Sequence, residues 1–343
     1  MKIQNKSKIN ILNDNILNKK FINTERDKFG IDCNILKDNF FIDSFNYFPI
    51  SEKGFVYADF FTWGDQKKYL NFFSENFEEN FNKNKKNFKN FKNVFVLGSS
   101  SVDNYYRNII TFLPRILFIQ EKKINLAIHR NSSNKLRFFI EQLCSEMSIE
   151  IKFTYLDDGF YKFNKSYIPQ FFDKKKAIKI LNQLKNKSSN KKEKLFISRQ
   201  NCNSRNLVNE GDVSKILKKA GFRILDMNDF NIAEQIKLFS NAEIVVSATG
   251  SALTNLIFCN PLVKVYEISP KYQFDYENSF RDRYKFIAEN LNLKYSRIEA
   301  DSINIKNLDN KIKQGISKKI LNESNYYKDL IIRLDQIERI LSN

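Results

Sequence analysis

The sequence has little histidine and no clustered cysteine. His129 is the only histidine among 343 residues, and the four cysteines are scattered without any Cys-x-x-Cys pair. A structural zinc site needs about four closely spaced cysteine or histidine ligands, so the sequence predicts none. The single histidine also excludes most Ser-His-Asp and Cys-His schemes, unless His129 itself is the base. A structural or surface role is the favoured interpretation of His129.

Long apolar runs are missing as well. No stretch of about 20 apolar residues occurs, so we expect no transmembrane helix. Residues 1–10 are basic, and no apolar segment of the kind found in secretory signals follows them, so we expect no cleaved signal. These absences predict a cytoplasmic protein whose cysteines remain free thiols.

Positive charge is abundant. The 57 Lys and Arg residues exceed the 39 Asp and Glu residues, which gives a net charge of +18. Such a charge favours acidic partners: nucleotide phosphates, nucleic acid or an anionic membrane surface. The lysines are dispersed and no RNP, zinc-finger or basic-zipper pattern occurs, so we expect no nucleic-acid partner. The length leaves room for two domains.

In the second half of the chain, short apolar strands alternate with amphipathic helices. Strands are expected at 195–197, 222–225, 243–247 and 263–268, and helices at 208–220, at 232–239 and from 250 to 258. Continuous apolar strands of this kind indicate a parallel sheet covered on both faces. Right-handed crossovers then make the second half a doubly wound, Rossmann-like α/β domain.

The first half has a similar but weaker alternation. Strands are expected at 94–97, 124–128 and 149–155, and helices at 104–118, with an interruption at Pro114, and at 135–147. Nine lysines and one acid at 174–194 indicate a helix followed by an exposed domain junction.

The two ends of the chain carry fewer signals. Tyr69, Phe73, Phe77 and Phe81 are four residues apart, which predicts one apolar stripe on a helix. The lysine-rich run 82–93 is interpreted as a solvated linker, with a phosphate- or membrane-facing patch as the alternative. A closing amphipathic helix is expected at 327–341.

Polar residues follow the first strand of the second half, at the kind of strand end where open α/β sheets bind ligands. Ser198 and Arg199 come directly after that strand, and Arg205 lies a few residues on. Two guanidinium groups at one strand end match a diphosphate, because arginine binds phosphate oxygens bidentately. The alternative is that these arginines pair with Glu210 or Asp212.

A second loop carries small residues. Thr249, Gly250 and Ser251 follow strand 243–247 and open a helix. A helix start offers unpaired backbone N–H groups and the positive end of the dipole. Gly250 allows close approach of the backbone, and Ser251 could cap the helix or donate to a phosphate.

Acidic residues stand at two further places. Glu267, near the end of strand 263–268, could accept hydrogen bonds from ribose hydroxyls, and the alternative is a surface ion pair with Lys264 or Lys271. The Asp157-Asp158-Gly159 sequence could form a metal pair, but an ordinary turn is the favoured interpretation.

The second-half segments, taken in order, resemble the family 61 glycosyltransferases. The segments that carry the resemblance are 197–205, 209–210, 221–222, 233–247, 250–258 and 265–270. A weaker match is Asn104-Tyr105 followed by Leu113-Pro114-Arg115, and the first 90 residues show no resemblance. The family includes bacterial capsule and polysaccharide enzymes, plant xylosyl- and arabinosyltransferases, and eukaryotic O-linked N-acetylglucosaminyltransferases.

The resemblance implies a GT-B architecture, in which two Rossmann-like lobes face a cleft. The implied domains are a variable N-terminal region at 1–93, an acceptor lobe at 94–175, a nucleotide-sugar lobe at 176–310, and C-terminal helices at 311–343 that pack back toward the first lobe. It implies inverting transfer from a nucleotide-sugar, usually a UDP-sugar, with no metal and no further cofactor. Arginine, lysine and helix dipoles would neutralise the departing diphosphate.

The resemblance also assigns roles to residues. Arg199 and Arg205 would clamp the diphosphate, Gly250 and Ser251 would supply N–H donors, and Glu267 would hold the nucleoside. Gln235 would support the donor lobe. The complete implied donor site consists of Ser198, Arg199, Arg205, Thr249, Gly250, Ser251, Asn255, which would brace its loop, and Glu267.

Two departures from the family pattern leave the catalytic base open. Family members often have histidine at the positions of Thr249 and Arg107 of this chain. They also often have an aspartate shortly after the second of these positions, where this chain has Thr111. Neither Thr249 nor Arg107 can act as a base near neutral pH. The candidates that remain are the carboxylates of Asp103, Asp157 and Asp158; alternatively, the chain is a degenerate relative that binds nucleotide without turnover.

The expected partners follow from the same resemblance. They are a nucleotide-sugar donor and a glycan or lipid-linked glycan acceptor in surface polysaccharide biosynthesis. The positive charge adds an expected peripheral contact with an anionic membrane surface. The sugar, the acceptor and the oligomeric state are not fixed by the sequence.

Overall fold

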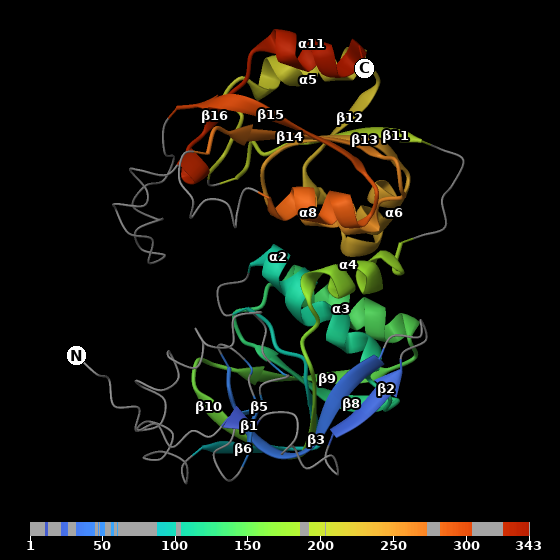
Figure 1. Ribbon diagram of the computed structural model, residues 1–343, viewed down its shortest axis with the longest axis vertical. Coiled ribbons are helices and arrows are strands. Elements are labelled where there is room, and N and C mark those ends of the chain that lie inside the picture. The colour runs from blue at the N-terminus through green and yellow to red at the C-terminus, as the bar shows by residue number, and fades with distance from the viewer. Residues whose placement is uncertain are drawn as a thin grey trace, which may run out of the picture. The chain divides into compact units, whose positions relative to one another are not determined.

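The chain folds into two compact units, Met1–Ile180 and Leu181–Asn343 (Figure 1). Both units contain a sheet and helices, so the α/β fold class is confirmed. The computed structural model describes residues 11–12, 22–26, 32–44, 47, 49–51, 56–57, 60, 88–100, 104–185, 192–202, 204–272, 282–303 and 325–342. The aromatic stripe expected at 69–81 lies outside these residues, and so does Asp103.

The first unit contains a mixed ten-stranded sheet in the order β1-β5-β4-β3-β10-β7-β8-β9, with β2 beside β3 and β6 beside β10. The strands are β1 (Ile11–Leu12), β2 (Ile22–Arg26), β3 (Asp32–Asp43), β4 (Pro49–Ser51), β5 (Val56–Tyr57), β6 (Lys89–Lys92), β7 (Val94–Val96), β8 (Lys123–His129), β9 (Glu150–Leu156) and β10 (Phe160–Pro169). Its helical segments are α2 (Tyr105–Arg107), the π-helix η4 (Asn108–Phe112), the 3-10 helix η5 (Leu113–Phe118), α3 (Asn134–Glu146) and α4 (Lys174–Asn182).

The three strands expected in this unit are present as β7, β8 and β9, which pair in parallel. The sheet as a whole is not Rossmann-like, because β3 pairs antiparallel with β10. Strands β2 and β4 also pair antiparallel with β3. The alternation of buried and exposed residues in β10 is interrupted at a bulge between Phe163 and Ser166, where Lys165 has φ 46°. Such a bulge breaks the period-two pattern that would have revealed the strand.

Two other expectations change in detail. The described end of the lysine-rich run is the strand β6 rather than a linker, and exposed lysines suit a strand at the side of a sheet. The helix expected at 104–118 is instead a succession of α, π and 3-10 turns. Pro114 stands at the start of the 3-10 segment, where a missing N–H is tolerated.

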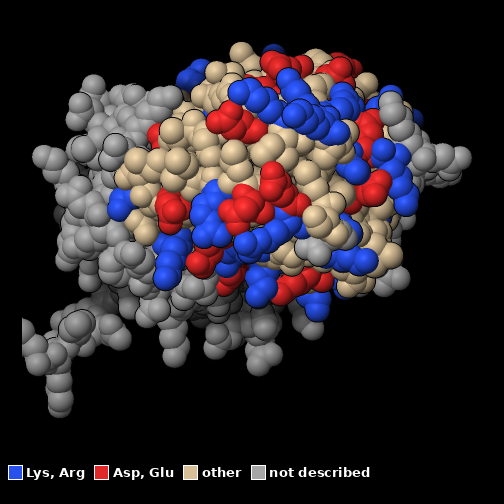
Figure 2. All heavy atoms as spheres, turned by 90° about the horizontal axis from the view of Figure 1, so that it is seen from above, with Lys and Arg blue, Asp and Glu red and all other residues tan. Residues whose placement is uncertain are grey.

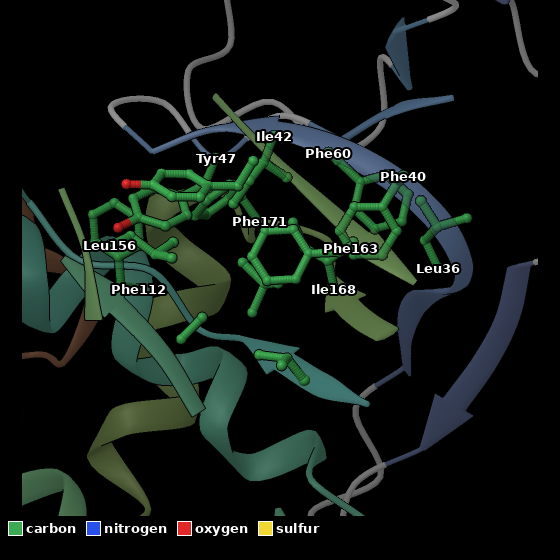
Figure 3. Close-up of a cluster of buried hydrophobic side chains, with 14 residues drawn as sticks. Leu36, Phe40, Ile42, Tyr47, Phe60, Phe112, Leu156, Phe163, Ile168 and Phe171 are labelled. Carbon is green, nitrogen blue, oxygen red and sulfur yellow. The ribbon is translucent and has the colours of Figure 1, made fainter. Parts of the chain in front are cut away.

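Aromatic side chains fill the core of the first unit (Figure 3). Phe40 stacks on Phe163 with ring centroids 5.7 Å apart, while Tyr47 and Phe171 each pack edge-on against Phe112. Gly98 follows β7 with φ 77°, and a Cβ there would lie 2.9 Å from the Tyr47 ring. The close packing therefore requires glycine at the turn that leaves β7.

The second unit contains a six-stranded sheet in the order β12-β11-β13-β14-β15-β16, parallel except for the last pair. The strands are β11 (Glu193–Ile197), β12 (Phe222–Leu225), β13 (Ala242–Ala248), β14 (Lys264–Pro270), β15 (Lys294–Ser302) and β16 (Leu330–Ile331). The helical segments are α5 (Glu210–Lys219), η6 (Met227–Asp229), α6 (Ile232–Ser240), η7 (Ser251–Phe258), α8 (Arg283–Asn290), η9 (Asn325–Tyr327) and α11 (Leu334–Ser342).

Helices cover both faces of this sheet, as the apolar strands predict: α5 and α11 lie on one face, and α6 and α8 on the other (Figure 1). The C-terminal helix is shorter than expected. It begins at Leu334, and Leu330 belongs to β16 instead. Ile337 and Ile340 of α11 are buried in the core of the second unit.

The face formed by α5 and α11 carries charges of both signs (Figure 2). Lys215 pairs with Asp212 at 2.9 Å, and Arg339 with Asp335 at 2.7 Å. These two basic side chains are therefore paired with acids on the same face. Among the described helices, none is both long and apolar enough to cross a membrane.

Candidate functional site

The end of β11 is held by a buried glutamate. Glu210, the first residue of α5, is buried and accepts hydrogen bonds from the Ser198 hydroxyl (2.5 Å) and from the Arg199 backbone N–H (3.1 Å). Its carboxylate thus fixes the turn that leaves the strand. Asp212, the other acid considered as an arginine partner, pairs with Lys215.

The Arg199 guanidinium closes the loop that follows. Its Nη2 donates to the Ser204 carbonyl at 2.8 Å and its Nε to the Arg205 carbonyl at 3.3 Å. The side chain is buried, and it lies against Gly250: a Cβ at Gly250 would be 1.8 Å from Nη1. The two loops that the sequence singled out therefore meet at the carboxyl edge of the sheet, and only glycine permits this contact.

Arg205 has an unusual backbone. Its φ of 60° lies in the left-handed region, which costs a non-glycine residue about 1–2 kcal/mol. Residues held in this conformation concentrate at functional sites. Burial raises the pKa of Glu267, and the charge of Arg205 opposes that rise, so Arg205 acts electrostatically on the end of β14 as well as on its own loop.

The helix that follows β13 starts without a side-chain cap. Gly250 occupies the cap position in an extended conformation, and Ser251 is exposed and makes no capping hydrogen bond, so the expectation that it caps the helix is wrong. The segment is the 3-10 helix η7. Leu253 N–H already donates to the Gly250 carbonyl. The N–H groups of Ser251 and Ala252 have no acceptor within the helix, which is the arrangement that favours anions at helix starts.

Asn255 and Gln235 lie together in the interior of the second unit. Asn255 Nδ2 donates to Gln235 Oε1 at 2.7 Å, and Gln235 Nε2 donates to the carbonyls of Met227 and Phe230 at 3.0 Å each. Both side chains are buried. This chain of hydrogen bonds ties η7 to α6, and so holds the helix start in place.

Glu267 is completely buried, so the surface ion pair with Lys264 or Lys271 is wrong. Burial raises the pKa of its carboxyl. The nearby hydroxyls of Thr249 and Tyr295 and the charges of Arg297 and Arg205 oppose that rise. The Tyr295 hydroxyl donates to Glu267 Oε2. Burial outweighs these opposing groups, so the pKa of the Glu267 carboxyl lies above its ordinary value.

Tyr295 and Arg297 are functional candidates that sequence reasoning missed. Both lie on β15, whose alternation of polar and half-buried residues was too weak to predict a strand. Arg297 pairs with Asp282 at 3.2 Å, and its guanidinium lies over the Tyr295 ring, 5.9 Å from its centroid. The only signal in the sequence was the proximity of a tyrosine and an arginine in a short segment, which has no specificity.

Apart from Thr249, which lies in the second unit, the described positions considered for the base lie in the first unit. Arg107 ends α2 and Thr111 lies in η4. Asp157 and Asp158 follow β9 in a bend, as the turn interpretation predicts. Within the described ranges, no three His, Cys, Asp or Glu side chains are grouped so that they could hold a metal ion.

The fold and these loops define an α/β protein with a polar site at the carboxyl edge of a parallel sheet. The family model for Glycosyltransferase 61 matches residues 105–266. This segment is slightly less than half of the chain, and the match supports membership in the glycosyltransferase 61 family, which the sequence resemblance predicts. The match includes Arg199, Arg205 and Gly250 but ends one residue before Glu267. No curated protein matches the chain significantly.

Proposed function

We propose that the protein transfers a sugar from a UDP-sugar to a hydroxyl of a glycan or lipid-linked glycan, with inversion at the anomeric carbon and without a metal ion. Family membership supports glycosyltransferase activity. The observation that carries the donor assignment is the contact of the Arg199 guanidinium with Gly250 at the start of η7. A GT-B arrangement and a role in surface polysaccharide synthesis at an anionic membrane belong to the same proposal.

The leaving diphosphate needs positive charge and N–H donors. In the proposal, Arg205 and the N–H groups of Ser251 and Ala252 bind its oxygens, where charge develops as the sugar departs. Arg199 acts as a brace, because two of its donor nitrogens are already used by the carbonyls of its own loop. Such preorganised donors need no rearrangement during the reaction, which is why a metal is not required.

The remaining donor residues have supporting parts in this scheme. Ser198 fixes the strand end through Glu210, and Asn255 anchors η7 through Gln235. Thr249 lies beside Glu267, whose carboxyl faces the nucleoside in the proposal.

Calorimetry with UDP tests the donor site. We expect Arg205→Ala to weaken UDP binding at least about tenfold, because a charge-assisted phosphate contact is worth roughly 1.5–3 kcal/mol. Arg223→Ala is the matched control: it removes the same charge from an exposed side chain of β12 that pairs with Glu193. The control should bind UDP as the wild type does. Undiminished binding in Arg205→Ala, or no binding in the wild type, would contradict the proposal.

A second candidate is a degenerate relative that binds nucleotide without turnover. It is favoured by one observation: Arg107 and Thr249 stand where the family often has histidine. This candidate predicts UDP affinity with no release of UDP from any UDP-sugar, whereas slow release would argue against it.

A further inference from the structure

The only histidine of the chain lies beside an aspartate at the carboxyl edge of the first unit's sheet. His129 is the last residue of β8, and Asp158 follows the neighbouring parallel strand β9. His129 Nε2 is 3.2 Å from Asp158 Oδ1. The His129 side chain is 2% exposed, whereas that of Asp158 is 74% exposed. A buried imidazole therefore orients a carboxylate that solvent can reach.

The backbone determines which imidazole nitrogen carries the proton. The Asn131 backbone N–H donates to His129 Nδ1 at 3.1 Å, so Nδ1 is an acceptor. In the neutral imidazole the proton must then lie on Nε2, which faces Asp158. His129 consequently donates to the carboxylate and leaves the other carboxylate oxygen for another partner.

A closed ring of hydrogen bonds fixes the end of β8. The Ser132 hydroxyl donates to the His129 carbonyl at 2.5 Å, and the His129 N–H donates to Ser99 Oγ at 2.9 Å. The two serine hydroxyls are 2.8 Å apart, and Ser99 must be the donor because Ser132 already gives its proton to the carbonyl. Both serines are buried. The two serines thus fix the backbone of His129, and the Asn131 N–H fixes its imidazole.

The turn that carries Asp158 is held from the other side. Ser44 Oγ donates to the Asp157 carbonyl at 2.6 Å and accepts from the Gly159 N–H at 3.0 Å, and the Ser44 N–H donates to the Gly159 carbonyl. These bonds flank Asp158 without involving its carboxylate. A catalytic group needs this kind of support to keep a fixed geometry.

The two neighbouring aspartates differ in what they can do. Asp157 accepts from Arg130 Nε at 2.6 Å and from Arg130 Nη2 at 3.4 Å, and this pair lowers the pKa of Asp157. Its carboxylate is therefore engaged and weakly basic. Asp158 accepts from the His129 imidazole rather than from a guanidinium, so the structure separates two of the three carboxylates that the sequence left open. The third, Asp103, lies outside the described residues.

We propose that Asp158 is the general base of the transfer reaction and that His129 is the residue that positions it. This inference rests on the proposed glycosyltransferase function. Asp158 takes the proton of the acceptor hydroxyl, and the acceptor oxygen forms a bond to the anomeric carbon. The bond from that carbon to the diphosphate oxygen breaks, and its electron pair leaves with UDP. Water can replace the acceptor in the same step, which releases free sugar.

The test measures UDP release from UDP-glucose, UDP-galactose, UDP-N-acetylglucosamine and UDP-xylose, with water or methyl glycosides as acceptors. We expect Asp158→Asn to lower kcat at least about 100-fold, because general bases contribute 10²–10⁴-fold. UDP affinity should remain within about twofold of the wild type. Asp157→Asn, the matched control, should keep kcat within a few-fold, because it removes the carboxylate that is bound to Arg130.

A second pair of variants tests the positioning role of His129. Gln can still donate a hydrogen bond to Asp158, and Leu cannot. We therefore expect His129→Gln to retain several-fold more kcat than His129→Leu at similar KM. Equal kcat in these two variants would show that His129 only fills space, and would overturn its positioning role.

Nitrogen-15 NMR gives a readout that needs no activity, because the chain has a single imidazole. The assignment predicts the Nε2-protonated tautomer at pH 8, and an Nδ1-protonated tautomer would overturn it. If UDP binds but Asp158→Asn releases UDP as fast as the wild type, the base assignment fails while the proposed function stands. If the wild type binds UDP but releases no UDP from any of the UDP-sugars, the assignment of Asp158 as the base also fails. If UDP does not bind at all, the proposed function itself fails.

Discussion

At Gly250 the backbone passes so close to the Arg199 guanidinium that one added methyl group has no room. A Cβ would lie 1.8 Å from Nη1 and 2.6 Å from Cζ. The guanidinium cannot withdraw freely, because it is buried and bonded to the carbonyls of Ser204 and Arg205. The close packing against the Arg199 side chain therefore requires glycine at position 250. Its extended φ of 176° would itself accept any residue.

We expect Gly250→Ala to displace Arg199, to destabilise the protein by roughly 1–3 kcal/mol and to weaken UDP binding. Gly211→Ala is the matched control, because Gly211 lies in α5 with nothing within 4 Å of its added Cβ. Alanine there should raise stability by about 0.4–1 kcal/mol through lower unfolded-state entropy and better helix propensity. Urea denaturation measures both, and equal midpoints for the two variants would contradict this account.

The sequence could predict part of this residue-level picture. Arg199 and Gly250 were found because strand ends and helix starts are recognisable from local pattern. The hydrogen bonds from the Arg199 guanidinium to the carbonyls of its own loop could not be predicted, because they depend on the backbone conformation of residues 199–205. Similarly, the sequence left open whether Glu267 forms a surface ion pair, and only the neighbouring strand β15 reveals its burial.

Between elements, Glu267 links two neighbouring parallel strands. It lies on β14 and accepts a hydrogen bond from Tyr295 on β15, in a fully buried position. Burial raises the pKa of its carboxyl above the ordinary value. The folded protein therefore keeps a proton that the unfolded chain loses once the pH exceeds about 4.3.

This linkage predicts a pH dependence of stability. Because the folded state binds more protons than the unfolded state in this window, the free energy of unfolding should fall as the pH rises from about 4.3 toward the raised pKa. The slope from this group is at most about 1.4 kcal/mol per pH unit. Glu267→Gln, whose amide stays neutral, should remove this decline and be more stable than the wild type at pH 8.

Urea denaturation from pH 5 to pH 8 checks this expectation. Glu299→Gln serves as the control, because Glu299 is an exposed glutamate on β15 and its replacement should leave the pH slope unchanged. An identical pH slope in the wild type and in Glu267→Gln would mean that Glu267 does not hold its proton.

Most elements that the sequence predicted are those with continuous apolar runs. Strands β7, β8, β11, β13 and β14 were found within a few residues, because both of their faces are buried. Strands β3, β10 and β15 were missed, since polar residues and a bulge interrupt their patterns. At 104–118 the pattern indicated a helix, but local pattern does not distinguish α from π and 3-10 turns.

At the scale of the whole molecule, the sequence predicted the α/β class and the parallel sheet of the second unit. It did not predict the mixed sheet of the first unit, where β3 pairs with β10 more than a hundred residues later in the chain. Pairing between such distant segments depends on tertiary packing, which leaves little trace in local pattern. Candidate site residues were easier to identify where they follow apolar parallel strands.

The family match at 105–266 begins in the first unit and ends in β14 of the second, so it includes both the proposed base and the loops proposed to bind phosphate. The residues around Glu267 and Tyr295 lie beyond it. The proposed donor site depends on a diphosphate that Arg205 and the start of η7 bind together.

A crystal structure of the full chain with UDP tests that claim most directly. We predict that the β-phosphate of UDP lies within hydrogen-bond distance of the Ser251 and Ala252 N–H groups and of the Arg205 guanidinium. UDP bound elsewhere, or with its diphosphate away from Gly250, would contradict the donor site and the function proposed from it.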